Sequence, residues 1–222
     1  MNTEIYEVLT KGLVDTLYML VITSIIAIII GLPLGTALVV TEKNNIYPLP
    51  KLNSILSGII NFIRSLPQVI LIIILLPVAR LIIGTTIGAN AAIVSLSIGS
   101  APFIARIIET SLKEVEYGKI EAALAMGASP RQIILKVLIP EALSSLFRGV
   151  TIGIIGIIGL TAIAGSIGAG GLGSVAIRFG YHRYRTDILA GTVILLVILV
   201  YLVQFIGDFL AKRIDKKRYK IK

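Results

Sequence analysis

The sequence predicts an all-α integral membrane protein with five transmembrane helices. Its 222 residues are 56% hydrophobic and have a mean hydropathy of +0.95, which is more apolar than a soluble globular domain. The apolar residues gather in five runs, each long enough for a helix rising ~1.5 Å per residue to cross a hydrocarbon core of ~30 Å. A longer charged stretch separates the third run from the fourth. We therefore expect one transmembrane domain over residues 1–222.

The five expected spans cover residues 16–40, 55–76, 89–108, 142–164 and 188–210. The first begins only after Asp15, with no basic segment or small-residue cleavage site, and it is too long for a signal-peptide core, so we interpret it as a span. Three helix-weakening residues, Gly31, Pro33 and Gly35, predict a bend near its end.

The basic residues predict the orientation of the chain. Seven of the 21 lie between Lys212 and Lys222, and basic residues concentrate on the cytoplasmic side of membrane proteins. We therefore expect a cytoplasmic carboxyl terminus and, with five spans, an amino terminus outside the membrane of a bacterial cell. Basic residues of the predicted inner loops agree with this, whereas Arg178, Arg183 and Arg185 oppose it. The net charge of +9 then reflects topology, and we expect no nucleic-acid partner.

The sequence offers few residues or motifs for catalysis, metal binding or nucleotide binding. Cysteine is absent, which excludes thiolate metal sites, and the lone His182 cannot form a metal cluster. Gly168, Gly170 and Gly173 match GxGxxG, but they follow a membrane helix and no strand precedes them. The phosphate-cradling pattern GxxxxGK followed by Ser or Thr does not occur. We expect no enzyme activity, cofactor or metal in the chain itself, so energy for any transport must come from a partner.

The charged stretch predicts two helices that meet at a turn. Residues 114–126 are good helix formers, and the small side chains of Ala122, Ala123 and Ala125 leave a helix surface that another protein can approach closely. Gly127 is expected to end this helix in a left-handed conformation. Ser129 can then cap a second helix that has Pro130 at its first position and Gln132 completing a capping box. We interpret the turn as a docking element for another protein.

The second of these helices carries an apolar face. Ile133, Ile134, Val137 and Leu138 have one-face helical spacing, and Pro140 either ends the helix or opens the next span.

The same stretch resembles the cytoplasmic EAA loop of ABC-importer permeases. The matching residues are Glu121, Ala122, Ala123, Gly127, Val137, Ile139 and Pro140, with Ser129 capping the second helix. The resemblance implies a type I ABC importer permease fold in which residues 109–140 form a cytoplasmic loop. In that family the loop's coupling helices sit in a cleft of the ATPase subunit. The alternative is a solvated amphipathic hairpin without a partner.

Four further runs resemble the methionine-uptake branch of these permeases: GLVDTLYMLVITS, NFIRSLPQVILIIILLPVARLIIGTTIG, APFIARIIETSLKEVEYGKIEAA and GSIGAGGLG. This implies a homodimer of the chain in membrane lipid, two ATPase subunits and an extracytoplasmic substrate-binding protein, together importing D- or L-methionine. The alternative is an ion-coupled secondary transporter or channel for small solutes. Only Arg64 and Asp208 are placed to serve a proton relay, and only loosely.

The outer end of the fourth span supplies the candidates for a gate: Leu160, Thr161, Ile163, Ser166 and Ile167. An apolar neck there would block ions by dewetting and leave selectivity to the binding protein. The alternative is that these residues pack against lipid or other spans.

Two further features leave alternatives open. Arg64 either extends to the cytoplasmic interface or forms a gate or subunit contact. The small-residue face of Gly149, Gly153 and Gly156 packs either within the chain or against a second copy. After them, GAGGLG is expected to be a flexible segment just outside the membrane, where its aromatic and basic continuation meets the binding protein.

Overall fold

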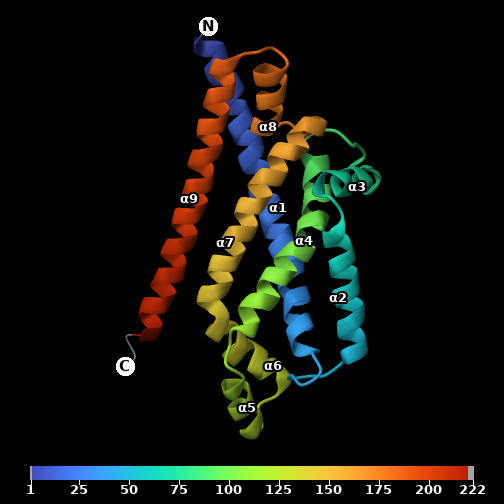
Figure 1. Ribbon diagram of the computed structural model, residues 1–222, viewed down its shortest axis with the longest axis vertical. Coiled ribbons are helices and arrows are strands. Elements are labelled where there is room, and N and C mark those ends of the chain that lie inside the picture. The colour runs from blue at the N-terminus through green and yellow to red at the C-terminus, as the bar shows by residue number, and fades with distance from the viewer. Residues whose placement is uncertain (1, 220–222) are drawn as a thin grey trace.

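The computed structural model describes residues 2–219, which form long helices that lie side by side. At one end, residues 117–133 form a short helical hairpin, called the hairpin below (Figure 1). The α-helices are α1 Asn2–Val40, α2 Pro50–Ser65, α3 Gln68–Ile83, α4 Ala89–Lys113, α5 Tyr117–Ala125, α6 Pro130–Ile133, α7 Ile139–Ala164, α8 Gly171–Val175 and α9 Thr186–Tyr219. Three π-helical segments join some of them: η1 Ile134–Leu138, η2 Gly165–Ala169 and η3 Ala176–Tyr181. Within the described range, helix is the only regular secondary structure.

Four helices are long and apolar enough to cross a membrane: Ile5–Val40, Ala89–Lys113, Pro130–Ala169 and Thr186–Lys216. They contain the predicted spans 16–40, 89–108, 142–164 and 188–210. Helix α1 starts well before residue 16, since its first turns pack on later parts of the chain. If a Cβ atom were added to Gly12 with ideal geometry, it would lie 2.9 Å from Val175 Cγ2. One added to Gly191 in the same way would lie 2.8 Å from Leu9 Cδ1.

The predicted span 55–76 is not one straight helix. Helices α2 and α3 meet at an angle of 108°, so the pair counts either as one broken span or as a re-entrant loop. Leu66 has extended backbone angles, φ −76 and ψ 134, because a residue that precedes proline is disfavoured in the helical region. Pro67 follows with φ −54 and ψ 129. With the bent pair counted as one span, the described residues form up to five candidate spans.

Helix α1 continues unbroken through Pro33, and its two nearby glycines have a packing role. An ideal Cβ at Gly31 would lie 2.7 Å from Ile104 Cγ2, and one at Gly35 would lie 2.5 Å from the carbonyl oxygen of Ala105. The missing side chains therefore let α4 lie directly against α1.

The small-residue face of α7 also packs inside the chain. An ideal Cβ at Gly149 would lie 2.6 Å from Ile107 Cγ2, and one at Gly153 would overlap the side chain of Ile104. Of the two alternatives for this face, contact with α4 of the same chain is the one observed.

The glycine-rich segment after α7 is not the flexible loop that its sequence predicts. Gly171, Leu172 and Gly173 are buried, and an ideal Cβ at Gly173 would overlap the backbone of Ala162. Gly168, Gly170 and Gly171 have φ of 97, 88 and 77, a conformation that glycine tolerates. The glycines thus allow a reversal in which α8 packs tightly between α1 and α7.

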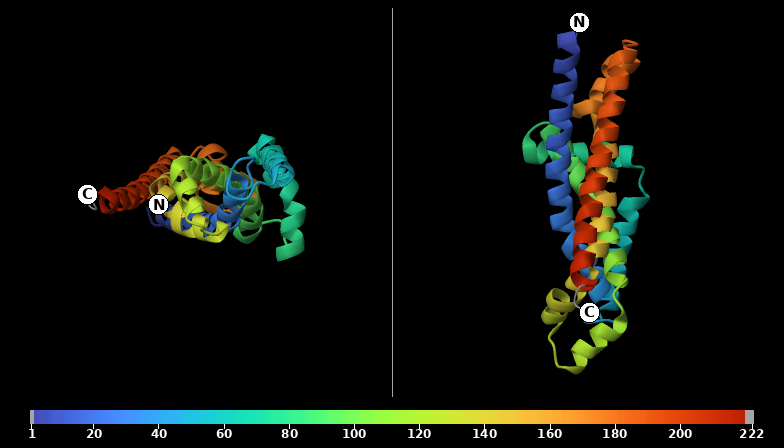
Figure 2. Two further views of the ribbon diagram at one scale, coloured as in Figure 1. Left: turned by 90° about the horizontal axis from the view of Figure 1, so that it is seen from below. Right: turned by 90° about the vertical axis from the view of Figure 1, so that its left-hand side faces the viewer.

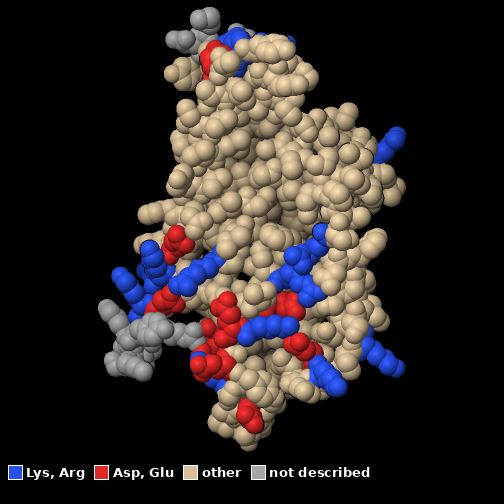
Figure 3. All heavy atoms as spheres, in the orientation of Figure 1, with Lys and Arg blue, Asp and Glu red and all other residues tan. Residues whose placement is uncertain are grey.

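The molecule is elongated in cross-section, with α9 and α3 at opposite edges (Figure 2). The start of α1 and the end of α9 lie at opposite ends of the bundle, and the end of α9 is on the side of the hairpin (Figure 1). Charged side chains gather in the lower part of the face shown in Figure 3 and at its top, with few between. Lys220 and Lys222 of the predicted basic tail lie outside the described residues.

Candidate functional site

The turn between α5 and α6 has the predicted geometry. Gly127 has φ 77, and its N–H donates to the carbonyl of Leu124 at 2.9 Å. The Oγ of Ser129 accepts from the N–H of Gln132 at 3.4 Å, while Gln132 Oε1 accepts from the N–H of Ser129 at 2.8 Å. The left-handed glycine and the capping box are therefore confirmed. The first helix is shorter than predicted, because Glu114 ends α4 and α5 starts only at Tyr117.

The second helix does not stop at Pro140. Segments α6, η1, α7 and η2 form one helical stretch over Pro130–Ala169. Pro140 cannot donate a backbone hydrogen bond, and its ring would crowd the carbonyl four residues earlier in a regular helix. The π-helical segment η1 lies just before it, and this wider turn makes room for the proline. The hairpin is thus joined to α7 without a break.

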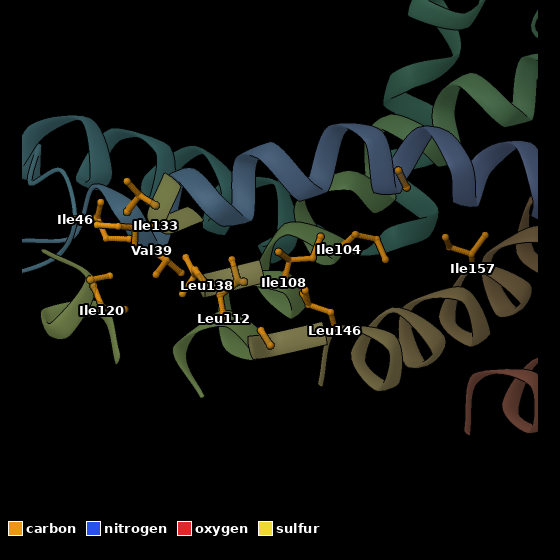
Figure 4. Packing of buried hydrophobic residues seen from close by; sticks show 14 of the residues in the cluster. Val39, Ile46, Ile104, Ile108, Leu112, Ile120, Ile133, Leu138, Leu146 and Ile157 are labelled. Carbon is orange, nitrogen blue, oxygen red and sulfur yellow. The ribbon is translucent and has the colours of Figure 1, made fainter. Parts of the chain in front are cut away.

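A hydrophobic cluster holds the hairpin against the ends of α1 and α4 (Figure 4). Ile120, Ala123, Ile133 and Leu138 are at most 4% exposed. They pack with residues of α1, α4 and the loop after α1: Val39, Val40, Ile46, Ile108 and Leu112. Val137 and Ile139 are partly buried against the same cluster. The hairpin is therefore part of the core of the protein and not a separate appendage.

The other face of α5 is exposed. Glu121, Ala122 and Ala125 lie on it beside two large apolar side chains, Leu124 and Met126, which are 40% and 82% exposed. Ala123 was predicted to lie on this small-residue surface, but it faces the core. It is three residues after the buried Ile120 and therefore lies on the same face of the helix.

An ion pair fixes α5 to the start of α7. Lys119 Nζ lies 2.6 Å from Glu141 Oε2. This contact and the hydrophobic cluster together attach α5 to the start of α7.

The gate candidates gather at the opposite end of α7. Leu160, Ile163 and Ile167 are partly buried against a second apolar cluster built of Met19, Ile72, Ala92, Ile93, Leu96, Ala164 and Ala169. Thr161 is 1% exposed, and its hydroxyl donates to the Ile158 carbonyl at 2.7 Å. Ser166 is exposed and donates to the Ile163 carbonyl at 2.6 Å. Thr161 therefore faces the interior of the chain, while Ser166 remains accessible.

Sequence reasoning missed a groove of about 410 Å³ between the end of α2 and the helices α4 and α7. Arginines from these three helices, Arg64, Arg106 and Arg148, contribute to its lining. Two of these arginines have ion-pair partners within the chain. Arg106 Nη1 lies 2.5 Å from Glu109 Oε2, and Arg148 Nη2 lies 2.6 Å from Asp215 Oδ2. The signal available in the sequence was a set of arginines in or beside apolar runs, which does not reveal that they converge.

Arg106 also ties α4 to α2. Its Nη2 donates to Ser57 Oγ at 2.8 Å and to Asn61 Oδ1 at 2.9 Å. These contacts hold the last turns of α2 beside α4 and so fix one wall of the groove.

Comparison with known proteins gives consistent matches over nearly the whole chain. Residues 27–220 match the family model described as binding-protein-dependent transport system inner membrane component. The chain is 46% identical over 203 residues to the probable D-methionine transport system permease protein MetI of Vibrio cholerae, covering 91% of this chain and 90% of that protein. It is 43% identical over 180 residues to the methionine import system permease protein MetP of Bacillus subtilis, covering 81% of each.

A solved structure also matches closely. A chain from inward-facing conformations of the MetNI methionine ABC transporter superposes with a TM-score of 0.94 at 43% identity, covering 96% of this chain and 99% of that one. The fold is thus the predicted all-helical importer-permease fold. The chain belongs to the family of binding-protein-dependent transport system inner membrane components, and it is a multi-pass membrane protein.

Proposed function

We propose that this chain is the permease subunit of an ATP-driven importer for D- and L-methionine, working as a homodimer with two ATPase subunits and an extracytoplasmic binding protein. The observation that carries the proposal is the exposed face of α5, formed by Glu121, Ala122, Leu124, Ala125 and Met126, on a hairpin continuous with a membrane-spanning helix. The relatives named above are methionine permeases, which supports this substrate.

The coupling mechanism follows from the way in which the hairpin is attached. The exposed face of α5 enters a cleft of the ATPase, and ATP binding draws the two hairpins of the dimer together. Because α6 runs into α7 without a break, the displacement passes along α7 as a lever. The buried cluster around Ile133 and Leu138 makes α1 and α4 follow. The hairpin and the carboxyl terminus are then cytoplasmic, and the amino terminus is outside.

The far end of α7 is where this displacement acts on the substrate path. Leu160, Ile163 and Ile167 form an apolar neck with the exposed Ser166 beside it, while Thr161 supports the neck from the interior of the chain, and the reversal at Gly165–Ala169 ends the moving helix. An apolar neck blocks ions by dewetting and binds amino acids weakly, so selectivity lies mainly in the binding protein.

The test is reconstitution in liposomes with the ATPase and binding protein of the same organism. Uptake of labelled L-methionine that requires both ATP and the binding protein is the expected result. The chain alone should hydrolyse no ATP and move no methionine. Uptake by the chain alone, driven by a proton or sodium gradient, would instead identify an ion-coupled transporter and overturn the proposal.

A further inference from the structure

The arginine groove between α2, α4 and α7 contains one guanidinium that has no partner among the described side chains. Arg106 is paired with Glu109, and Arg148 with Asp215. Among the side chains of residues 5–216, Arg64 has neither a hydrogen-bond partner nor an ion-pair partner for its side chain. Glu114 contributes an acidic side chain to the same lining, without an ion pair to Arg64.

The position of Arg64 makes this lack of a partner costly. It lies in the last turn of α2, about 21 Å from Pro50 at ~1.5 Å per residue, and α2 ends near the middle of the molecule (Figure 1). An unpaired charge deep in a bilayer costs about 2.5–3.5 kcal/mol on insertion scales. A guanidinium retained at this depth requires either a water-filled groove or an anion.

The rest of the lining suits an amino acid with an apolar side chain. Phe103, Ile107 and Ile152 supply apolar surface, and the volume of about 410 Å³ admits a small molecule with water. A guanidinium binds a carboxylate through two parallel hydrogen bonds, a geometry that ammonium groups do not match.

The groove is also fixed in shape and linked to the moving parts. Gly149 lies directly against Ile107, so α4 and α7 cannot separate easily along one wall. Arg64 itself lies three residues before Pro67, where α2 and α3 meet at 108°. Arg64 therefore lies on the part of α2 that Arg106 holds beside α4, directly before the break.

We infer that this groove is an inner binding site for the transported amino acid, in which Arg64 holds the substrate carboxylate while Phe103, Ile107 and Ile152 contact its side chain. This inference rests on the proposed function and adds a substrate site on the inner half of the transport path. Arg106 holds α2 beside α4 through its hydrogen bonds to Ser57 and Asn61, and Arg148 is paired with Asp215.

The absence of cysteine from the sequence permits a direct test by labelling. Thr110 is exposed and lines the groove, so Thr110→Cys introduces a single thiol there. The assembled complex in liposomes is treated with a neutral maleimide, without ATP, in the presence of L-methionine or of L-methioninamide, which lacks the carboxylate. We expect L-methionine to slow labelling several-fold and the amide to have little effect.

Substitutions then assign the effect to Arg64. In the Thr110→Cys background, Arg64→Gln should abolish protection and Arg64→Lys should retain part of it, since lysine keeps the charge but not the paired donors. Arg80→Gln is the matched control, because Arg80 is an exposed arginine in the last turn of α3 outside the groove. It should leave protection unchanged. Co-purification with the ATPase reports whether each variant has assembled.

Each of three protection results would overturn the inference: equal protection by methionine and its amide, protection that persists in Arg64→Gln, or no protection by either compound. A thiol at residue 110 that does not react in the absence of amino acid would also overturn it, because the groove would then be covered by lipid or a second copy. Methionine uptake is measured on the same liposomes. An absence of uptake by the complex with the unmodified chain would contradict the proposed function, whereas protection requires binding alone and decides the groove separately.

Discussion

The hydroxyl of Thr16 accepts a hydrogen bond of 2.8 Å from the backbone N–H of Leu172, 156 residues later in the chain. The same hydroxyl donates to the carbonyl of Gly12 at 2.9 Å. Both Thr16 and Leu172 are buried, at 1% and 0% exposure. A polar contact thus links α1 to the start of α8, where the chain reverses after α7.

Thr16→Val should destabilise the protein without changing its shape. Valine keeps the volume but leaves the Leu172 N–H buried and unpaired, at a cost of about 1–3 kcal/mol. Thermal unfolding of the purified protein in detergent measures the effect. The exposed Thr10 provides the matched control, and Thr10→Val should leave the midpoint nearly unchanged. Equal midpoints for the two variants would mean that the Thr16 contact adds no stability.

Gly173→Ala should loosen the packing of α8 on α7. A Cβ at this position would overlap the backbone of Ala162, which cannot rotate away as a side chain can. Overpacking of this kind typically costs about 1–3 kcal/mol. Gly159→Ala is the control, since Gly159 is exposed on α7 and a Cβ there meets no atom within 4 Å. We expect a lower unfolding midpoint for Gly173→Ala alone, and a normal midpoint would show that α8 can shift without penalty.

Gly127→Val should impair coupling while leaving membrane insertion intact. A Cβ at Gly127 meets no atom within 4 Å, so the penalty comes from the backbone, whose φ of 77 a branched residue rarely adopts. The strain is on the order of 1–3 kcal/mol, and unwinding the turn to relieve it would misplace the face of α5. Co-purification with the ATPase and the ratio of ATP hydrolysed to methionine imported are the measurements.

Gly127→Asn is the graded comparison for this position, since asparagine tolerates the left-handed conformation better than valine. It should retain more coupling than Gly127→Val. Normal ATPase binding, stimulated hydrolysis and uptake in the valine variant would show that the turn is dispensable.

Ile163→Ala should raise passive leak through the assembled complex. The substitution removes apolar volume from the neck and from its contact with the cluster around Met19 and Leu96. Release of labelled methionine from loaded liposomes without ATP measures the leak. Ile194→Ala, on the exposed surface of α9, controls for a general loss of apolar volume and should leave the leak unchanged. A leak equal to that of the unmodified complex would place the gate elsewhere.

The local signals in the sequence predicted the geometry of the turn between α5 and α6 in detail. Gly127, Ser129, Pro130 and Gln132 lie within six residues, and their conformations depend on neighbouring backbone groups. Composition and apolar run length likewise predicted a helical membrane protein, because burying unpaired backbone groups in lipid is costly at any position.

Contacts between distant segments decided the features that the sequence left open or predicted wrongly. The glycine-rich segment looked flexible, but α1 and α7 on either side turn it into a packed reversal. Gly149 faces α4 of the same chain, and Ala123 faces the core, although the sequence pattern permits other partners. Arg64, Arg106 and Arg148 converge only because three helices meet at one level. Hydrophobicity specifies that a helix is buried, whereas the neighbour that each face contacts is selected by the packing of all the helices together.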